Sequence, residues 1–191
     1  MEIWGWGRKN TADVNSKGQL KTYAEAFGVA YDAGIDGDAY TMDIDNITVG
    51  AAGNTLALMK NSHSTKKLIV AKFELTPNTA DDDQEIEVYI GGAFTYLAEG
   101  TAVVPACMAS GKSGGAPGGV ADSFYVSDGT ADTLTTITAG TIAGRFPMPS
   151  KLKYVCEVPS YWRIDPGNCF YLTATKDEKF RGFISFFYKD A

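Results

Sequence analysis

Glycine and proline interrupt this chain so often that long helices are excluded. The 191 residues include 21 glycines and 7 prolines, and the longest stretch without either is Asn54–Thr76. Even there, Leu68–Leu75 is rich in β-branched and aromatic residues, which favour a strand. The composition therefore rules out a helical bundle and predicts short strands as the main element.

Apolar and polar residues alternate with a period of two in several segments, as in a sheet with one solvated face. The alternation is clear over Tyr40–Asp45 and again over Glu85–Ile90. Across the chain we expect roughly nine to eleven strands at a spacing typical of an all-β sandwich or barrel.

Two turns and one closing strand are predicted locally. The Gly91–Gly92 pair can supply the positive φ angles of a tight hairpin between Glu85–Ile90 and Ala93–Leu97. Asp165–Asn168 has Pro and Gly placed for a type II turn. Phe183–Tyr188 is apolar on both faces and is expected to be an inner strand.

The first residues do not fit the main sheet. Trp4 and Trp6 are flanked by glycines and followed by Arg8, Lys9 and other polar residues, so we expect an arm rather than a first strand. The predicted organisation is an N-terminal arm over residues 1–20 and a β-sandwich domain over residues 21–191. Aromatic side chains suit such an arm because they supply large contact areas.

The net charge and the cysteine content indicate which partners the protein could bind and in which cellular compartment it is made. The net charge of −6 argues against nucleic acid or an anionic membrane as the partner. Cys107, Cys156 and Cys169 form no metal-binding or redox spacing, and we expect them to be reduced and buried. No apolar run is long enough to span a bilayer, and no signal peptide is recognisable, so synthesis in a cytoplasm is expected.

No catalytic pattern stands out. Ala106–Ser113 approaches a phosphate-binding loop, but the glycine-rich segment that follows cannot begin the required helix, and we expect only a flexible loop over residues 110–119. His63, the single histidine, has serine neighbours that predict a polar turn. We therefore expect no enzyme activity and no cofactor.

Acidic loops and aromatic residues leave two binding alternatives open. Oxygen-rich loops could hold calcium, although none has the spacing of a known calcium loop and no metal is expected. Those loops contain Asp36, Asp38, Asp81–Asp83, Asp128 and Asp132. A sugar could contact Tyr96, Tyr161 and Trp162, although aromatic residues more often fill a sandwich core.

Three short segments resemble structural proteins of tailed-phage particles, above all the head decoration (cement) proteins. Asp13–Leu20 resembles a segment near the start of such proteins, and Thr65–Lys72 resembles the strand that opens their sandwich. Trp162–Leu172, followed by Gly182–Phe186, resembles their closing hairpin, with Asp165 in place of the first proline of the turn.

The resemblance implies a jelly-roll type of β-sandwich that forms a trimer on the surface of a phage head. Its partner would be the major capsid protein, its location the virion, and its task the stabilisation of the mature capsid. Trp4, Trp6, Arg8 and Lys9 would then contact the capsid or a neighbouring subunit. The alternative is a receptor-binding or carbohydrate-binding module of a tail fibre or spike.

Overall fold

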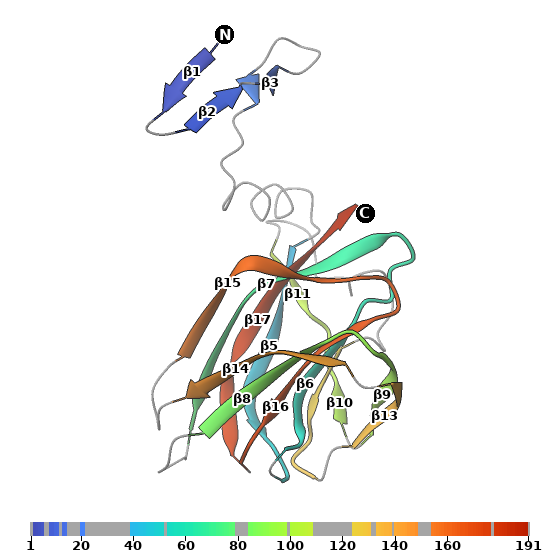
Figure 1. The fold of residues 1–191 in the computed structure, drawn as a ribbon. Coiled ribbons are helices and arrows are strands. Elements are labelled where there is room, and N and C mark those ends of the chain that lie inside the picture. Colours follow the sequence, from blue (N-terminus) through green and yellow to red (C-terminus); the bar gives the residue numbers. More distant parts are fainter. Residues whose placement is uncertain are drawn as a thin grey trace.

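The computed structural model is all-β in the part of the chain that it describes (Figure 1). The described residues are 2–5, 8–11, 13–14, 20–21, 39–51, 53–78, 84–98, 100–108, 124–130, 133–138, 140–148, 154–176 and 178–190. These ranges contain strands and turns but no helix. The expected fold class is thereby confirmed at the level of an all-β protein with two antiparallel sheets.

Four short strands precede the main sheets and pair with each other. β1 (Glu2–Gly5) pairs with β2 (Arg8–Thr11), and β3 (Asp13–Val14) pairs with β4 (Leu20–Lys21). None of the four pairs with a described strand of the two main sheets, and the arm over residues 1–20 stays a prediction. Ile3 and Trp4 in β1 are of the β-branched and aromatic types that favour an extended backbone.

One antiparallel sheet has six strands in the order β10-β12-β6-β16-β8-β14. Their bounds are β6 Thr55–Lys60, β8 Gln84–Ile90, β10 Gly100–Ala102, β12 Phe124–Ser127, β14 Thr141–Met148 and β16 Cys169–Ala174.

The second antiparallel sheet has five strands in the order β11-β5-β17-β7-β15. Their bounds are β5 Ala39–Thr48, β7 Lys66–Pro77, β11 Ala106–Cys107, β15 Tyr154–Ile164 and β17 Lys179–Asp190. β17 lies between β5 and β7, so the prediction of an inner strand over Phe183–Tyr188 is confirmed.

The main strands pair in a nested order. β5 pairs with β17, β6 with β16, β7 with β15 and β8 with β14, so the earliest strand meets the latest and pairing proceeds inward along the sequence. Successive strands alternate between the two sheets from β5 to β8 and again from β14 to β17. These eight strands therefore form four nested antiparallel pairs, two in each of the two main sheets.

The predicted hairpin at Gly91–Gly92 is wrong, although both glycines have positive φ as expected (85° and 80°). β8 pairs with β14 and β16, so both of its edges are occupied. The next strand, β9 (Ala93–Ala98), pairs instead with β13 (Thr133–Thr138) in a separate two-stranded sheet. The two glycines have the predicted sign of φ, but the strands on either side of them pair with other partners.

The turn at Asp165–Asn168 is confirmed. Asn168 N donates to the carbonyl oxygen of Asp165 at 3.0 Å, and Gly167 has φ of 83°. The turn joins β15 in one sheet to β16 in the other.

The core lies between the two sheets and is rich in aromatic side chains. Phe73 and Phe186 of the five-stranded sheet and Phe124 and Phe170 of the six-stranded sheet are fully buried. The rings of Phe124 and Phe186 stack across the two sheets, with centroids 5.3 Å apart. Cys169 is buried as expected, Cys107 is only half-buried, and the side chain of Cys156 lies outside the described residues.

Candidate functional site

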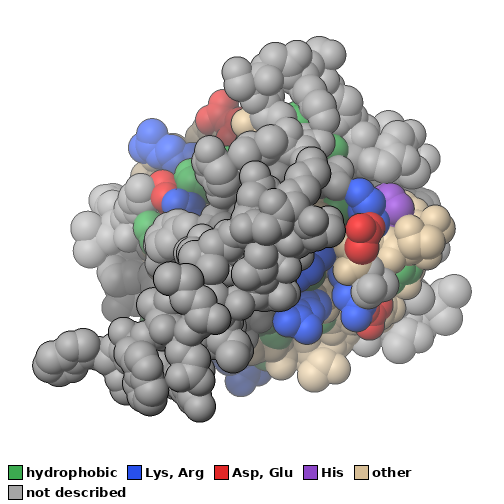
Figure 2. Space-filling model, turned by 90° about the horizontal axis from the view of Figure 1, so that it is seen from above, with side chains coloured by type: hydrophobic (Ala, Val, Ile, Leu, Met, Phe, Trp, Pro, Cys, Tyr) green, Lys and Arg blue, Asp and Glu red, His purple; other side chains and the backbone are tan. Residues whose placement is uncertain are grey.

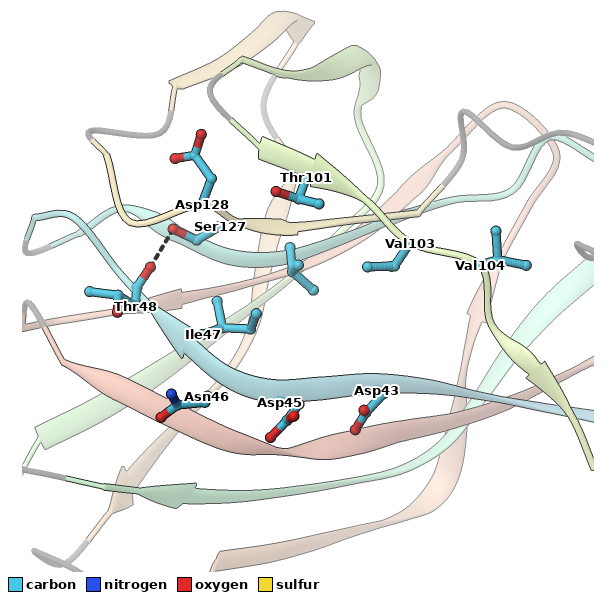
Figure 3. Close-up of a pocket in the computed structure, with 11 residues that line it drawn as sticks. Asp43, Asp45, Asn46, Ile47, Thr48, Thr101, Val103, Val104, Ser127 and Asp128 are labelled. Carbon is cyan, nitrogen blue, oxygen red and sulfur yellow. Dashed lines mark hydrogen bonds between the residues drawn. The ribbon is translucent and has the colours of Figure 1, made fainter.

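A cavity of about 520 Å³ opens between the second half of β5 and the strands β10 and β12 of the opposite sheet (Figure 3). The described residues that line it include four with apolar side chains, Ile47, Val103, Val104 and Val126. The remaining lining residues are polar or acidic: Asp43, Asp45, Asn46, Thr48, Thr101, Ser127 and Asp128. No lysine or arginine is among these lining residues.

A buried serine joins the two walls of the cavity. Ser127 at the end of β12 donates from Oγ to the carbonyl oxygen of Thr48 at the end of β5, at 2.6 Å (dashed in Figure 3). Gly129 N donates to the same Oγ at 3.2 Å. Because Ser127 is only 2% exposed, this bridge holds the sheets together where water does not compete for the hydroxyl.

The three carboxylates of the cavity do not converge. Figure 3 shows Asp43 and Asp45 on the far side of the β5 ribbon from Ile47, and Asp128 at the opposite rim. The Asp128 carboxylate accepts hydrogen bonds from Thr130 N (3.0 Å) and Thr130 Oγ1 (2.7 Å). The hydroxyl donor of Thr130, followed by its backbone N–H, lowers the pKa of Asp128 below its ordinary value.

No group of three or more His, Cys, Asp or Glu side chains that could hold a metal exists in the described part of the chain. Of the acidic loops considered for calcium, Asp128 is engaged by Thr130 as above. The other members, Asp36, Asp38, Asp81–Asp83 and Asp132, lie outside the described residues, as does the glycine-rich loop over residues 110–119.

A β-bulge shapes the rim of the cavity. Asn46 has φ of 54°, and the pairing of β5 with β17 shifts by one residue at this point. The side chain of Asn46 accepts a hydrogen bond from Asn78 Nδ2 at 3.2 Å, and Asn78 Oδ1 accepts one from Arg181 at 2.9 Å. Asparagine tolerates this left-handed backbone better than most residues do.

A second polar cluster lies on the outer side of the six-stranded sheet. The rings of Tyr89 and Tyr171 stack almost in parallel, with centroids 4.6 Å apart. The Tyr89 hydroxyl donates to Glu87 Oε2 at 2.7 Å, and Arg145 Nε lies 2.8 Å from Glu87 Oε1. The carboxylate of Glu87 is therefore engaged on both oxygens, as expected of an ion pair that supports the sheet.

This arrangement moves two pKa values in opposite directions. The hydrogen bond from Tyr89, and next the contact with Arg145, hold the pKa of Glu87 below its ordinary value although partial burial opposes the shift. Burial, followed by the neighbouring Glu87 carboxylate, raises the pKa of Tyr89 to about 12.

The single histidine lies in the polar turn that the sequence predicted. His63 Nδ1 accepts hydrogen bonds from Lys66 N at 3.0 Å and Thr65 N at 3.2 Å. Its ring packs beside Tyr188, with centroids 5.7 Å apart. Figure 2 shows basic and acidic side chains close to this histidine. Lys67 Nζ lies 3.6 Å from Asp165 Oδ1.

For most of the residues predicted to bind a partner, the structure gives the position in a strand but not the side chain. Trp4 lies in β1, and Arg8 and Lys9 lie in β2, where Trp4 is opposite Lys9; their side chains, and all of Trp6, lie outside the description. The same holds for the side chains of Tyr96 in β9 and Tyr161 in β15.

Trp162 belongs to the aromatic core. Its ring stacks on Phe73 (6.2 Å between centroids) and also contacts Phe146 and Phe170. Trp162 is thus one of the partly buried aromatic residues that pack against the core, and its contact with a sugar stays a prediction.

Comparison with protein-family models, curated proteins and solved structures finds no match for this chain. In the described residues, no helix is long and apolar enough to cross a membrane.

Proposed function

We propose that this chain is a non-enzymatic decoration protein of a tailed-phage head, which binds the major capsid protein and stabilises the mature shell. The observation that carries the proposal is the separation between the first strands and the body. β1–β4 pair only among themselves in the described structure, and no described strand of the two main sheets pairs with them. Such a chain offers a self-sufficient body and a segment available for contacts with a partner.

The nested strand pairing supports a jelly-roll type of sandwich, which is the fold that the resemblance implies. Eight strands, β5–β8 and β14–β17, pair first with last and continue inward, and they divide into two four-stranded layers. A rolled ribbon of eight strands is the arrangement by which a jelly roll forms its two sheets. The strands β9–β13 are then an insertion between the fourth and fifth strands of the roll.

Decoration also agrees with the charge distribution. Residues 1–21 carry a net charge of +2, whereas the remaining residues carry −8. A basic segment on an acidic body can approach an acidic groove on a shell while the bodies repel one another. Because many copies act on one ordered shell, modest affinity for each copy is sufficient for high occupancy.

The proposal is tested by the position and number of copies in phage particles. Heads and tails are separated from a purified preparation, and the chain is quantified by mass spectrometry against the major capsid protein. Decoration predicts a copy number comparable with that of the capsid protein, in the head fraction. A few copies in the tail fraction would instead support receptor or carbohydrate binding, and absence from both would overturn the proposal.

The role of the first segment is tested on the same particles. Charge reversal at Arg8→Glu and Lys9→Glu should lower occupancy of heads that lack the wild-type chain. Lys17→Glu and Lys21→Glu give a matched change in charge farther along the segment. Equal occupancy by the wild-type chain and the Arg8/Lys9 variant would remove these residues from the contact.

A further inference from the structure

The outer edge of β5 is paired over only part of its length. β11 covers Tyr40 and Thr41, and Ala39 O accepts a hydrogen bond from Met108 N at 2.8 Å. Before β11 the chain runs through β10, which is an edge strand of the six-stranded sheet. Among the described strands, none therefore pairs with β5 beyond Thr41 on this edge.

The alternation of an antiparallel ladder identifies the backbone groups on the remaining part of this edge. The N–H and C=O groups of Ala39 and Thr41 point to β11, so those of Asp43 and Asp45 point to the same edge. The opposite edge of β5 is occupied by β17 as far as Thr48. A row of outward N–H and C=O groups is a template on which another strand can pair.

The two faces of this open edge differ in chemistry. Asp43 and Asp45 are exposed on the outer side of β5, whereas Ile44 between them is fully buried on the inner side. The cavity borders the edge, and Ile47 and Val103 supply apolar surface from its two walls (Figure 3). A strand laid along this edge would therefore meet carboxylates on one face and apolar surface on the other.

The charge beside the edge indicates what kind of strand it would bind. Asp43, Asp45 and Asp128 are among the residues that line the cavity, and none of the described lining residues is a lysine or an arginine. Side chains directly opposite each other on two paired strands lie on the same face of the sheet, where opposite charges attract. Basic residues opposite Asp43 and Asp45 would leave the residue between them on the inner face, where an apolar side chain fits.

We propose that the open edge of β5 and the adjacent cavity bind an extended segment of a different protein, in which basic residues alternate with apolar ones. The segment extends the five-stranded sheet antiparallel to β5, as β11 does, and its main-chain groups pair with those of Asp43 and Asp45. Two of its basic side chains face these carboxylates, and the apolar residue between them enters the cavity. This inference does not depend on the proposed capsid role.

The probe is the pentapeptide Val-Lys-Val-Lys-Val with blocked termini, titrated at low salt into the isotope-labelled full-length chain and followed by nuclear magnetic resonance. The backbone amide signals of Asp43 and Asp45 should shift, and their hydrogen exchange should slow, because the peptide covers their N–H groups. Amides of β8 should not respond, because both edges of that strand are already paired. Absence of a response at Asp43 and Asp45 would overturn the proposal.

Two control peptides separate the alternating pattern from bulk charge. Val-Val-Val-Lys-Lys has the same composition as the probe, but its consecutive lysines lie on opposite faces of a strand. Val-Glu-Val-Glu-Val keeps the alternation and reverses the charge. The probe should bind about tenfold more tightly than either control at low salt. Equal affinity for the two lysine peptides would contradict the proposed alternation, and equal affinity for the glutamate peptide would contradict the role of the carboxylates.

Methylation of the peptide backbone tests strand addition without any change to the chain. In the proposed pairing, the N–H groups of the two lysines point to β5, whereas that of the central valine points away from it. A methyl group on both lysine nitrogens should abolish binding, and a methyl group on the central valine nitrogen should change the affinity by less than about twofold. Equal affinities of the two methylated peptides would overturn the role of the open edge.

Variants of the chain test the same contact from the other side. Asp43→Lys combined with Asp45→Lys should reverse the preference, so that the glutamate peptide binds more tightly than the probe. Asp190→Lys reverses an exposed charge at the far end of β17 and should keep the wild-type preference, with circular dichroism as the check on folding. An unchanged preference in the double variant would overturn the proposal.

Sedimentation velocity separates a foreign segment from a second copy of the chain. Wild-type oligomers that the probe peptide dissociates would assign the edge of β5 to self-association and overturn the proposal. All of these measurements use the isolated chain, whereas head occupancy is measured on particles. Failure of this inference is therefore distinguishable from failure of the decoration proposal.

Discussion

Ser127 Oγ lies 2.6 Å from the carbonyl oxygen of Thr48, and this contact links the last residue of β12 to the last residue of β5. The two strands belong to different sheets. The same hydroxyl accepts from Gly129 N, so it also orders the turn that follows β12. One buried hydroxyl therefore serves both the closure of the sandwich and the shape of the cavity.

Ser127→Ala should lower the free energy of unfolding by about 1–2 kcal/mol, because the Thr48 carbonyl loses its donor and Gly129 N loses its acceptor. The measurement is urea denaturation monitored by fluorescence. Ser185→Ala, on the outer side of β17, is the matched control and should have little effect. Equal losses in the two variants would contradict a special role for the bridge.

Gly182→Ala should be among the most damaging single changes in the chain. Gly182 has φ of 152°, and an added Cβ would lie 1.8 Å from the backbone oxygen of Glu74 on the adjacent strand. Neither backbone can move without breaking the β17–β7 ladder. We therefore expect Gly182→Ala to lower the free energy of unfolding by at least about 3 kcal/mol, or to make the expressed chain insoluble.

Gly167→Ala is the control for that change. Gly167 also has positive φ, at 83°, but no atom lies within 4 Å of its added Cβ. Gly167→Ala should lower the free energy of unfolding by about 1–2 kcal/mol, because the alanine must adopt a backbone conformation that it disfavours. Both variants are compared by thermal and urea unfolding, and a loss for Gly182→Ala as small as that for Gly167→Ala would disprove the close contact.

Phe186 and Phe183 lie on opposite faces of β17 and should respond differently to truncation. Phe186 is 1% exposed and stacks on Phe124 and Tyr40, so Phe186→Ala should cost about 3–5 kcal/mol. Phe183 is half-buried with Lys72 Nζ 5.0 Å from its ring centroid, and Phe183→Ala should cost about 1 kcal/mol. The free energies of unfolding are measured with denaturant. A larger loss for Phe183→Ala than for Phe186→Ala would refute this assignment of faces.

Tyr89 should make the protein sensitive to alkaline pH. Its pKa in the folded chain is raised to about 12 from 10.0, so the neutral phenol is favoured by folding. The stability that this provides is fully present below pH 10 and is lost as the pH rises towards 12. In Tyr89→Phe, the free energy of unfolding should therefore decrease less between pH 10 and pH 12 than it does in the wild-type chain.

The titration is read by ultraviolet absorbance of tyrosinate. The difference between the wild-type chain and Tyr89→Phe isolates one tyrosine, which should ionise near pH 12. Glu87→Gln keeps the ring in place but removes the neighbouring charge, so it should lower the pKa of Tyr89 towards its ordinary value. A difference curve centred at pH 10 would contradict the contact between the two side chains.

Residue types and their periodicity are enough to predict the all-β class and much of the local structure. Alternation over Tyr40–Asp45 indicated which side chains of β5 face inward, and Met42 and Ile44 are indeed fully buried. The turn at Asp165–Asn168, the polar turn at His63 and the inner strand near Phe183–Tyr188 were also predicted. These features depend on residue types and periodicity within a few positions, which a sequence displays directly.

The pairing of the strands, in contrast, is visible only in the folded chain. Gly91 and Gly92 both have positive φ, yet β8 and β9 do not pair, because β14 and β16 already occupy both edges of β8. The contact between Ser127 and Thr48 and the open edge of β5 likewise join residues that are distant in sequence. Residue spacing carries no record of such contacts, because which segments share an edge depends on packing between residues that are far apart in the sequence.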